Sequence, residues 1–250
     1  MFKTFKRSLV CLALCAGAAH ADLPADYKMV LLTENFPPFN MAVDDKNFAR
    51  DDGIDGISAE IVREMFKRAK IGYSLSLRFP WDRLYKLTQE KPNYGLFSTT
   101  RTPEREGAFK WVGPLGKTAW VLAAAPNSGI VLKDLKDAGK YKVGGYKNNA
   151  VSQAVESQGV PLIATLRDQE NVKKLEKGQI DLWATDDPAG RYMAKQEGMG
   201  GLRIVLRFNE GELYLAINKE TPDEVVERLQ RALDQMRAEG FIDEITKNYL

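Results

Sequence analysis

The sequence predicts an α/β protein made of two similar halves. Short apolar runs alternate with amphipathic stretches along most of the chain, which is typical of helices packed on a sheet. This alternation occurs twice, and the turn-forming run Pro126-Asn127-Ser128-Gly129 follows the apolar segment 117–125, after which the second set begins. A further strand and helices come after the second set. We therefore expect two lobes, with the last helices completing the first.

The expected lobe boundaries follow from this order of elements. Residues 22–115 and 212–250 would form lobe 1, and residues 116–211 would form lobe 2. The chain would cross between lobes near 115–120 and return near 208–212. Two crossings make a hinge, and the cleft beside a hinge is a natural site for a ligand.

The first set of elements is predicted from hydrophobic periodicity. Ile57, Ile61, Met65 and Ala69 recur at helical spacing and predict a helix over 57–69. A second helix is expected at Trp81–Gln89, before a Lys-Pro-Asn break. The expected strands are Lys28–Thr33, Ser74–Leu77 and Tyr94–Ser98.

The second set begins after the apolar run Lys117–Ala125 and its turn. Its elements are short and alternate regularly in type. The expected helices are Val131–Ala138, Ala150–Ser157, Gln169–Lys177 and Pro188–Gln196. The expected strands are Tyr141–Gly145, Leu162–Thr165, Ile180–Thr185 and Arg203–Arg207.

The C-terminal region combines a strand over Leu213–Asn218 with a strongly signalled helix. Thr221 is expected to cap this helix, with Pro222 at its first position and Glu224 completing a capping box. Its buried face is predicted to comprise Val225, Leu229, Leu233 and Met236. Gly240 ends the helix, and Phe241–Tyr249 is expected to form a final short helix.

The first 21 residues are expected to be a secretion signal. Lys3, Lys6 and Arg7 precede a short apolar core, and Ala19-His20-Ala21 is a small-x-small cleavage site. The apolar core is too short for a transmembrane helix. A lipoprotein signal ending at Cys15 is the alternative, but Leu14 fits it poorly. We expect cleavage after Ala21 and export to the periplasm.

Removal of that segment changes the chemistry open to the chain. Cys11, Cys15 and His20 all lie within it, so the mature chain would have neither Cys nor His. A His base, a Cys nucleophile and a zinc site of His or thiolate are excluded, and we expect no metal and no cofactor. The 36 basic residues fall to 33, against 34 acidic ones. Nothing in that balance favours nucleic acid or an anionic membrane as a partner.

Arg105 is the first candidate for ligand binding. A guanidinium can hold a carboxylate through two parallel hydrogen bonds. Arg105 follows a strand end, and Thr102-Pro103-Glu104 resembles a helix start, whose free N–H groups favour an anion. The alternative is a solvated surface arginine, which spacing alone would favour. Arg101 is expected to face elsewhere.

Asp186 is the second candidate, at the end of the apolar run Leu182-Trp183-Ala184. A carboxylate there is able to accept hydrogen bonds from an ammonium group. The alternative role for Asp186 is a helix N-cap ahead of Pro188, for which Asp187 is equally suited. A cationic fork and a separate anion together would hold a free amino acid by both charged ends.

Aromatic residues and one helix start provide further candidates. Phe36 and Phe39 lie in a proline-containing loop after the first strand, where Phe36 is expected in a pocket wall and Phe39 in the core. Trp81 begins a helix, and a core position is its alternative. Asn149 and Ala150 begin another helix, whose N–H groups would face the ligand unless the segment is only a capped turn.

Several motifs, in order and spacing, resemble the periplasmic amino-acid-binding proteins of ABC importers (bacterial solute-binding protein family 3). The resemblance covers nearly all of the mature chain. It includes Pro37-Pro38-Phe39, Asp52-Gly53-Ile54-Asp55-Gly56, Thr102-Pro103-Glu104-Arg105 and the strand Asp181–Asp186, with Gly240-Phe241 and Tyr249 near the end. It implies a type II periplasmic-binding-protein fold, in which each of two lobes has a mixed sheet flanked by helices.

The resemblance also implies roles for individual residues. Arg105, helped by Thr100, would hold the ligand α-carboxylate, to which Asn149 and Ala150 would offer backbone N–H groups. The backbone carbonyl of Ser98 and the carboxylate of Asp186 would accept from the α-ammonium group. Phe36 and Trp81 would flank the ligand side chain.

Two features depart from the family pattern. Asn148-Asn149 replaces the usual Gly-Thr or Gly-Ser turn, although Asn tolerates left-handed backbone angles. Glu34 is unusual beside the pocket. It would either select a basic side chain or face solvent.

The resemblance implies a monomeric binding protein without catalysis, which captures a small amino acid or similar zwitterion and delivers it to the membrane permease of an ABC importer. Two alternatives stay open. A ligand-binding sensor would use the same binding chemistry, and a cyclohexadienyl-dehydratase-like enzyme on this fold would need a general acid, for which Glu34 and Glu104 are candidates.

Overall fold

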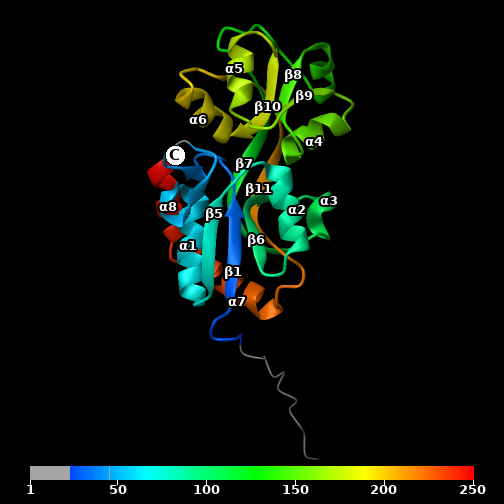
Figure 1. Cartoon of the computed structure of the whole chain (residues 1–250). Coiled ribbons are helices and arrows are strands. Elements are labelled where there is room, and N and C mark those ends of the chain that lie inside the picture. The colour runs from blue at the N-terminus through cyan, green and yellow to red at the C-terminus, as the bar shows by residue number, and fades with distance from the viewer. Residues whose placement is uncertain (1–22, 45) are drawn as a thin grey trace, which may run out of the picture.

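The computed structural model describes residues 23–44 and 46–250. It is a mixed α/β structure in which helices flank one large sheet (Figure 1). The expected signal peptide, residues 1–21, lies outside the described residues. Within them, none of the helices has both the length and the apolar character that crossing a membrane requires.

The large sheet has nine strands and runs through the whole molecule. In spatial order they are β3 (Ala49–Arg50), β5 (Gly72–Leu77), β1 (Lys28–Thr33), β6 (Tyr94–Thr100), β11 (Arg203–Ile217), β7 (Lys110–Ala124), β10 (Leu182–Asp187), β8 (Val143–Tyr146) and β9 (Leu162–Thr165). β2 (Met41–Ala42) and β4 (Ile54–Asp55) form a separate two-stranded sheet.

Two long antiparallel strands, β7 and β11, join the two parts of the sheet. Both are 15 residues long, and in Figure 1 they run between a lower and an upper group of elements. Parallel strands β5, β1 and β6 belong to the lower group, here called the first half. Parallel strands β10, β8 and β9 belong to the upper group, the second half. The predicted crossings, 115–120 and 208–212, lie within these two long strands, and the lobe boundaries stay a prediction.

Helices α1 (Ile57–Ala69), α7 (Asp223–Ala238) and α8 (Phe241–Tyr249) pack together on the first half, and α2 (Trp81–Glu90) packs on β6. Their apolar faces form most of its core, as the periodicity predicts. The buried residues include Ile57, Ile61, Met65 and Ala69 of α1, and Val225, Leu229, Leu233 and Met236 of α7. Full burial of each Ile, Val, Leu or Met side chain among them contributes about 1.5–3 kcal/mol relative to exposure.

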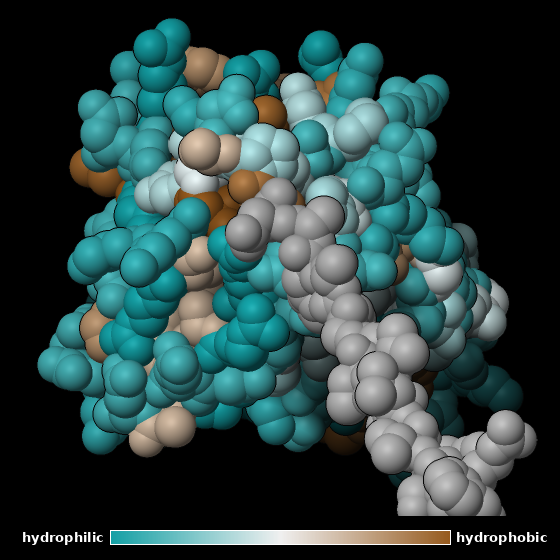
Figure 2. Space-filling view, turned by 90° about the horizontal axis from the view of Figure 1, so that it is seen from below, coloured by the Kyte–Doolittle hydropathy of each residue, from teal (hydrophilic) through white to brown (hydrophobic). Residues whose placement is uncertain are grey.

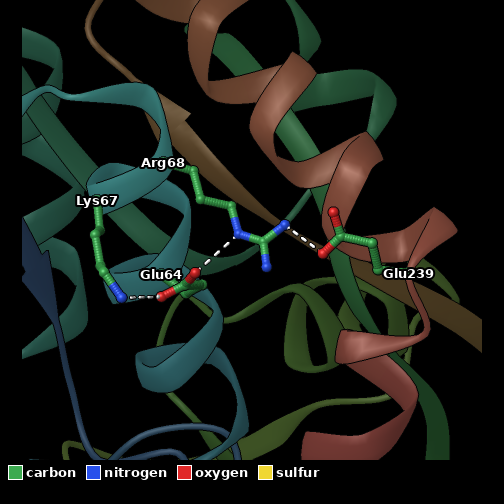
Figure 3. Close-up of polar contacts among 4 residues, drawn as sticks. All are labelled: Glu64, Lys67, Arg68 and Glu239. Carbon is green, nitrogen blue, oxygen red and sulfur yellow. Dashed lines mark hydrogen bonds and ion pairs between the residues drawn. The ribbon is translucent and has the colours of Figure 1, made fainter.

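A polar contact at the rim of this core links α1 to the end of α7 (Figure 3). Arg68 donates to Glu64, one turn earlier on α1, at 2.8 Å, and to Glu239, directly after α7, at 2.6 Å. Lys67 pairs with the other oxygen of Glu64 at 3.2 Å. One guanidinium thus links α1 to the residue that follows α7, and because the Glu239 side chain is more than half exposed, this pair adds little to the stability that the apolar packing provides.

The end of the molecule formed by the first half is largely hydrophilic (Figure 2). Hydrophobic side chains appear there singly or in small groups, which is ordinary for a protein surface. The large hydrophobic side chains of α1 and α7 are accordingly found in the core rather than on this face.

In the second half, α4 (Ala150–Ser157), α5 (Glu170–Glu176) and α6 (Ala189–Gln196) cover both faces of β8, β10 and β9. Their apolar residues form two further clusters. Val151, Val155 and Leu182 belong to one cluster, and Val172, Trp183 and Met193 belong to the other. Trp183 is fully buried on β10.

Three sequence-based expectations about elements are wrong. Strands expected at 203–207 and 213–218 are one strand, β11, because β7 provides backbone partners through the polar stretch between them, with register shifts that absorb its irregularities. The helix expected at 131–138 is a 3-10 helix, Leu135–Lys140, that Asp134 caps. Thr221 does not cap α7, which begins at Asp223 with Pro222 at its N-cap.

Two shorter elements complete the described chain. A 3-10 helix, Asp51–Gly53, leads into β4. The short helix α3 (Pro103–Glu106) follows β6, with Pro103 in its first turn as the Thr-Pro-Glu motif predicts. α3 matters for function because it carries Arg105.

Candidate functional site

A cleft lies at the carboxyl ends of β1, β6, β8 and β10, with walls from both halves. Its walls enclose about 550 Å³, including the part that is open to solvent. The nine residues that the sequence singles out for ligand binding all line it: Glu34, Phe36, Trp81, Ser98, Thr100, Arg105, Asn149, Ala150 and Asp186. Glu104, the other candidate general acid, is exposed and does not line it. Strand ends in an open α/β sheet bring residues distant in sequence to one edge, which explains the convergence.

Arg105 is buried, with 5% of its surface exposed. Its guanidinium donates to the carbonyls of Thr100, at 3.3 Å, and Asn148, at 3.1 Å, and to Oε1 of Gln153 at 3.2 Å. It also lies 5.8 Å from the ring centroid of Trp81. No carboxylate of the described residues lies within ion-pair distance of it. Burial lowers the pKa of Arg105, but an arginine keeps its charge in proteins.

The surface alternative for Arg105 is therefore wrong, whereas Arg101 does face elsewhere. Arg101 donates to Glu106 at 2.7 Å and its guanidinium lies over the rings of Trp111 and Tyr214. Arg101 does not line the cleft. Two arginines in one segment thus have different roles, one in a surface ion pair and one as a buried cation at the cleft.

Asp186, on β10, faces the cleft from the other side. Only 6% of its surface is exposed, and its buried Oδ1 has no donor at hydrogen-bond distance among the described residues. Desolvation raises the pKa of its carboxyl to about 7, although the Thr118 hydroxyl lies near enough to act in the lowering direction. The N-cap alternative is wrong, because α6 begins at Ala189 without a side-chain cap. Asp187 instead pairs with Arg191 and Arg207.

Glu34, just after β1, contacts the opposite wall. Its Oε2 accepts a hydrogen bond from the hydroxyl of Tyr146, which lies at the end of β8. Desolvation raises the pKa of Glu34 to about 8, and the nearby Asp168 and Asp82 raise it further, against the lowering effect of the Tyr146 hydrogen bond. The solvent-facing alternative for Glu34 is wrong, since its carboxyl is part of the cleft lining.

Tyr146, which follows the expected strand Tyr141–Gly145, also lines the cleft, although it is not among the candidates predicted from the sequence. Its side chain is buried, and its hydroxyl also accepts from the backbone N–H of Trp81 at 3.1 Å. Burial beside the Glu34 carboxyl raises the pKa of Tyr146 well above its ordinary value. The position directly at a strand end is the signal that would have identified it.

Asp168, in the loop between β9 and α5, is a second cleft residue that is not among the candidates predicted from the sequence. Oδ1 accepts from Trp183 at 2.8 Å and from Asn171 at 3.0 Å. Oδ2 accepts from Thr185 at 3.3 Å. Burial raises the pKa of this carboxyl to about 6. Because both oxygens have donors within the second half, Asp168 acts on the cleft through its charge.

The remaining residues of the first-half wall are held by local contacts. Ser98 has a left-handed backbone with φ 56°, and its hydroxyl donates to Asn40. Phe36 stacks on Phe39 with ring centroids 5.3 Å apart. Phe39 is buried in the core and Phe36 is partly exposed in the cleft wall, in agreement with the prediction.

The second-half wall includes the start of α4. Asn148 adopts the left-handed backbone that the turn requires, with φ 61°, so the departure from Gly is compatible with the fold. Asn149 is the N-cap and accepts from the N–H of Ser152 at 2.7 Å. The first backbone N–H groups of α4, which have no acceptors within the helix, lie at the cleft.

The charges of the cleft are complementary to a molecule with groups of both signs. One buried guanidinium, Arg105, lies in the same cleft as the carboxyl groups of Glu34, Asp168 and Asp186. An isolated buried charge is costly unless it has a partner. Among the described residues, no three His, Cys, Asp or Glu side chains are grouped so that they could hold a metal ion.

Comparisons with known proteins agree with this architecture. Among solved structures, a histidine kinase sensor domain with similarity to periplasmic binding proteins has a TM-score of 0.79 and 16% sequence identity, and the match covers 89% of this chain and 96% of that one. An ancestral arginine-binding protein bound to glutamine has a TM-score of 0.76 and 21% identity, with coverages of 89% and 97%.

A third structure is the ancestral amino acid-binding protein AncCDT-1, a precursor of cyclohexadienyl dehydratase. It has a TM-score of 0.74 and 18% identity, with 89% of this chain and 94% of that chain covered. At these identities the solved structures establish the two-lobed fold and leave the ligand open. A comparison with curated protein sequences finds no match.

A family model matches residues 29–250 of this chain. That range includes every residue of the cleft and both long strands. The chain therefore belongs to the bacterial extracellular solute-binding proteins, family 3.

Proposed function

We propose that the protein captures a free amino acid in this cleft, with Arg105 at the ligand carboxylate and Asp186 at the α-ammonium group. The observation that carries the proposal is that a buried guanidinium without a carboxylate partner and a buried carboxyl oxygen without a donor line the same cleft. A zwitterion would satisfy both groups at once. Ser98, Thr100, Asn149 and Ala150 would add hydrogen bonds, and Phe36 and Trp81 would flank its side chain.

The charge of the cleft extends this proposal to the class of side chain. Asp168 has donors on both oxygens, whereas Oε1 of Glu34 has none among the described residues. A second cationic group on the ligand would pair with that oxygen. The preferred ligands would therefore be amino acids with a basic side chain, and an arginine-binding protein is among the structures of similar fold.

The two halves would act as lobes that close on the ligand, with residues 22–115 and 212–250 in one lobe and 116–211 in the other. β7 and β11 provide the two crossings that a hinge needs. Ligand contacts with both walls would stabilise the closed form, because a ligand shifts the equilibrium only through its difference in affinity for the two forms.

Binding would serve import. We propose an exported monomer in the periplasm, with the signal peptide removed after Ala21, that delivers its ligand to an ABC importer permease. Family membership supports the extracellular location. The alternative is a sensor, which the similarity in fold to a histidine kinase sensor domain supports. Ligand uptake by cells that lack the gene separates the two: import predicts lost uptake, and sensing predicts unchanged uptake.

The test of binding itself is a thermal-shift screen of the common amino acids, followed by calorimetry. A ligand at a hundredfold excess over its dissociation constant should stabilise the folded protein by about 2.7 kcal/mol. Arginine, lysine or ornithine should give the largest shift, and glutamine, of similar size but without the cation, a smaller one. A screen in which no amino acid stabilises the protein would refute the proposed function.

One observation favours an enzymatic alternative. The pKa of Glu34, raised to about 8 in a cleft, would leave this carboxyl protonated at neutral pH and able to act as a general acid in a dehydration. Incubation with arogenate or prephenate distinguishes this alternative. Steady formation of product that Glu34→Gln abolishes would favour a dehydratase, and no turnover is expected if the protein only binds.

A further inference from the structure

Tyr146 forms a bridge across the cleft, and its hydroxyl has no remaining hydrogen to donate. That hydroxyl carries a single hydrogen, which it donates to Oε2 of Glu34, while it accepts from the N–H of Trp81 at 3.1 Å. The side chain is 7% exposed, so water has little access to replace these partners. One of the two Glu34 oxygens is therefore already engaged by the protein.

The other oxygen of Glu34 is the one more open to a ligand. Among the described residues, no donor lies within hydrogen-bond distance of Oε1, and Glu34 lines the same cleft as Arg105 and Asp186. Asp168 offers no comparable oxygen, because Trp183 and Asn171 donate to Oδ1 and Thr185 to Oδ2. Oε1 is thus open to the side chain of a ligand on both of its lone pairs, whereas Oε2 has only one lone pair left beside the Tyr146 hydroxyl.

This difference between the two oxygens of Glu34 discriminates between the two kinds of basic side chain. A guanidinium binds a carboxylate best through two parallel N–H bonds that use both oxygens. An ammonium is a compact charge with rotatable donors and needs only one oxygen. Resting on the proposed function, we propose that Tyr146 determines specificity by engaging one oxygen of Glu34, so that the cleft favours ligands with a side-chain ammonium over those with a guanidinium.

Calorimetric titration with lysine, ornithine and arginine tests this role. The wild type should bind lysine at least about tenfold more tightly than arginine, a difference of about 1.4 kcal/mol. Tyr146→Phe removes the hydroxyl and keeps the ring. It should reduce the lysine-to-arginine affinity ratio by about tenfold or more.

The matched control is Tyr27→Phe, since the Tyr27 hydroxyl donates to Asn93 at 2.5 Å outside the cleft. This variant should keep the wild-type ratio. Circular dichroism and thermal unfolding establish that both variants fold. Glu34→Gln provides a second measurement, because it removes the carboxylate on which Tyr146 acts. In this variant the affinities for lysine and for arginine should both fall close to the affinity for glutamine.

The possible outcomes separate this inference from the proposed function. A Tyr146→Phe variant that binds lysine and arginine with the wild-type ratio overturns the role of Tyr146 and leaves amino-acid binding intact. A wild type that prefers arginine also overturns it. If a folded wild type binds no amino acid, the proposed function itself fails, and this inference fails with it.

Discussion

At the residue scale, Arg105 is a buried cation whose charge is not neutralised by any carboxylate of the described residues. Its guanidinium contacts two carbonyls and one amide oxygen, and two aromatic rings lie near it. These contacts fix its orientation without opposing its charge. A ligand carboxylate would provide that opposition in a site with little competing water.

We expect Arg105→Ala to weaken binding of every amino acid by about 2–5 kcal/mol, because the ligand carboxylate would be buried without its partner. Arg105→Lys should recover only part of the loss, since an ammonium cannot form two parallel bonds. Arg101→Ala is the matched control, because Arg101 pairs with Glu106 away from the cleft. Calorimetry that finds equal affinities for Arg105→Ala and Arg101→Ala would contradict the assigned role.

The carboxyl of Glu34 makes binding of a basic amino acid dependent on pH. Its pKa in the free protein is raised to about 8 by desolvation first, and then by Asp168 and Asp82. A bound cation would favour the ionised form and lower that pKa. Binding below pH 8 would therefore release a proton from Glu34, and this proton alone should raise the affinity for lysine between about pH 6 and 8 by at most about tenfold per unit.

Titrations in two buffers of different ionisation enthalpy count the protons released. Asp186, with a pKa raised to about 7, would release a proton to the solvent with any amino acid, so glutamine provides the reference. The additional release with lysine should disappear in Glu34→Gln. Equal proton release for lysine and glutamine in the wild type would show that no side-chain cation reaches Glu34.

The residues that sequence reasoning identified and missed differ in the information they carry locally. Arg105 and Asp186 lie in short motifs that follow apolar runs, so the local sequence indicates the end of a strand, where open α/β sheets bind ligands. Asp168 has no such motif, and its position depends on Trp183, Asn171 and Thr185, which come from other elements. Such contacts depend on tertiary packing, which the hydrophobic periodicity of the sequence does not predict.

At the element scale, helices were predicted more closely than long strands. Helix 57–69 has the bounds that its apolar period indicates, because a complete amphipathic face is visible in the sequence. β11 includes Asn209-Glu210-Gly211-Glu212, which resembles a turn when considered alone. Pairing with β7 keeps this stretch extended, since Glu210 lies opposite Ala119 and Gly211 opposite Thr118.

Gly211 allows this close pairing. A Cβ at position 211 would lie 2.4 Å from Nε1 of Trp120 and 3.0 Å from Oγ1 of Thr118, and the indole of Trp120 is 5% exposed. We expect Gly211→Ala to lower the free energy of unfolding by about 1–3 kcal/mol through overpacking. Urea denaturation measures the loss. Gly107→Ala, with no atom within 4 Å of its Cβ, should change it little, and equal stability of the two variants would contradict this account.

At the scale of the whole molecule, the sheet explains why two distant parts of the chain form one cleft. The parallel strands of the first half and those of the second half end at the same cleft. Two long antiparallel strands, β7 and β11, join both halves into one sheet. The alternation of apolar and amphipathic segments predicts two such sets, so the fold class followed from the sequence. The contact between Glu34 and Tyr146 across the cleft depends on how the two halves pack against each other, which the alternation of segments does not predict.

The cleft carboxyls also determine how the stability of the free protein changes with pH. Folding raises the pKa of Glu34 to about 8, of Asp186 to about 7 and of Asp168 to about 6. The folded state therefore binds more protons than the unfolded state between about pH 4 and 8. Stability must fall as pH rises through this window, because the unfolded state then gains more by ionisation.

Other groups do not mask this trend. Carboxyls with lowered pKa, such as Glu64 beside Arg68, act in the opposite direction, but only below their ordinary range near pH 4.5. The one histidine, His20, lies in the expected signal peptide. We expect unfolding in urea to show a loss on the order of a few kcal/mol between pH 5 and 8. Glu34→Gln with Asp186→Asn should remove most of it.

A basic amino acid at saturating concentration should weaken this loss of stability with rising pH. The bound cations would lower the pKa values of Glu34 and Asp186, so the complex would hold fewer protons than the free folded protein and lose less stability as pH rises. The gap between the unfolding curves of complex and free protein should therefore widen from pH 5 to 8. If the gap stays constant, the ligand does not meet these carboxyls, because a cation placed beside them must displace their protons.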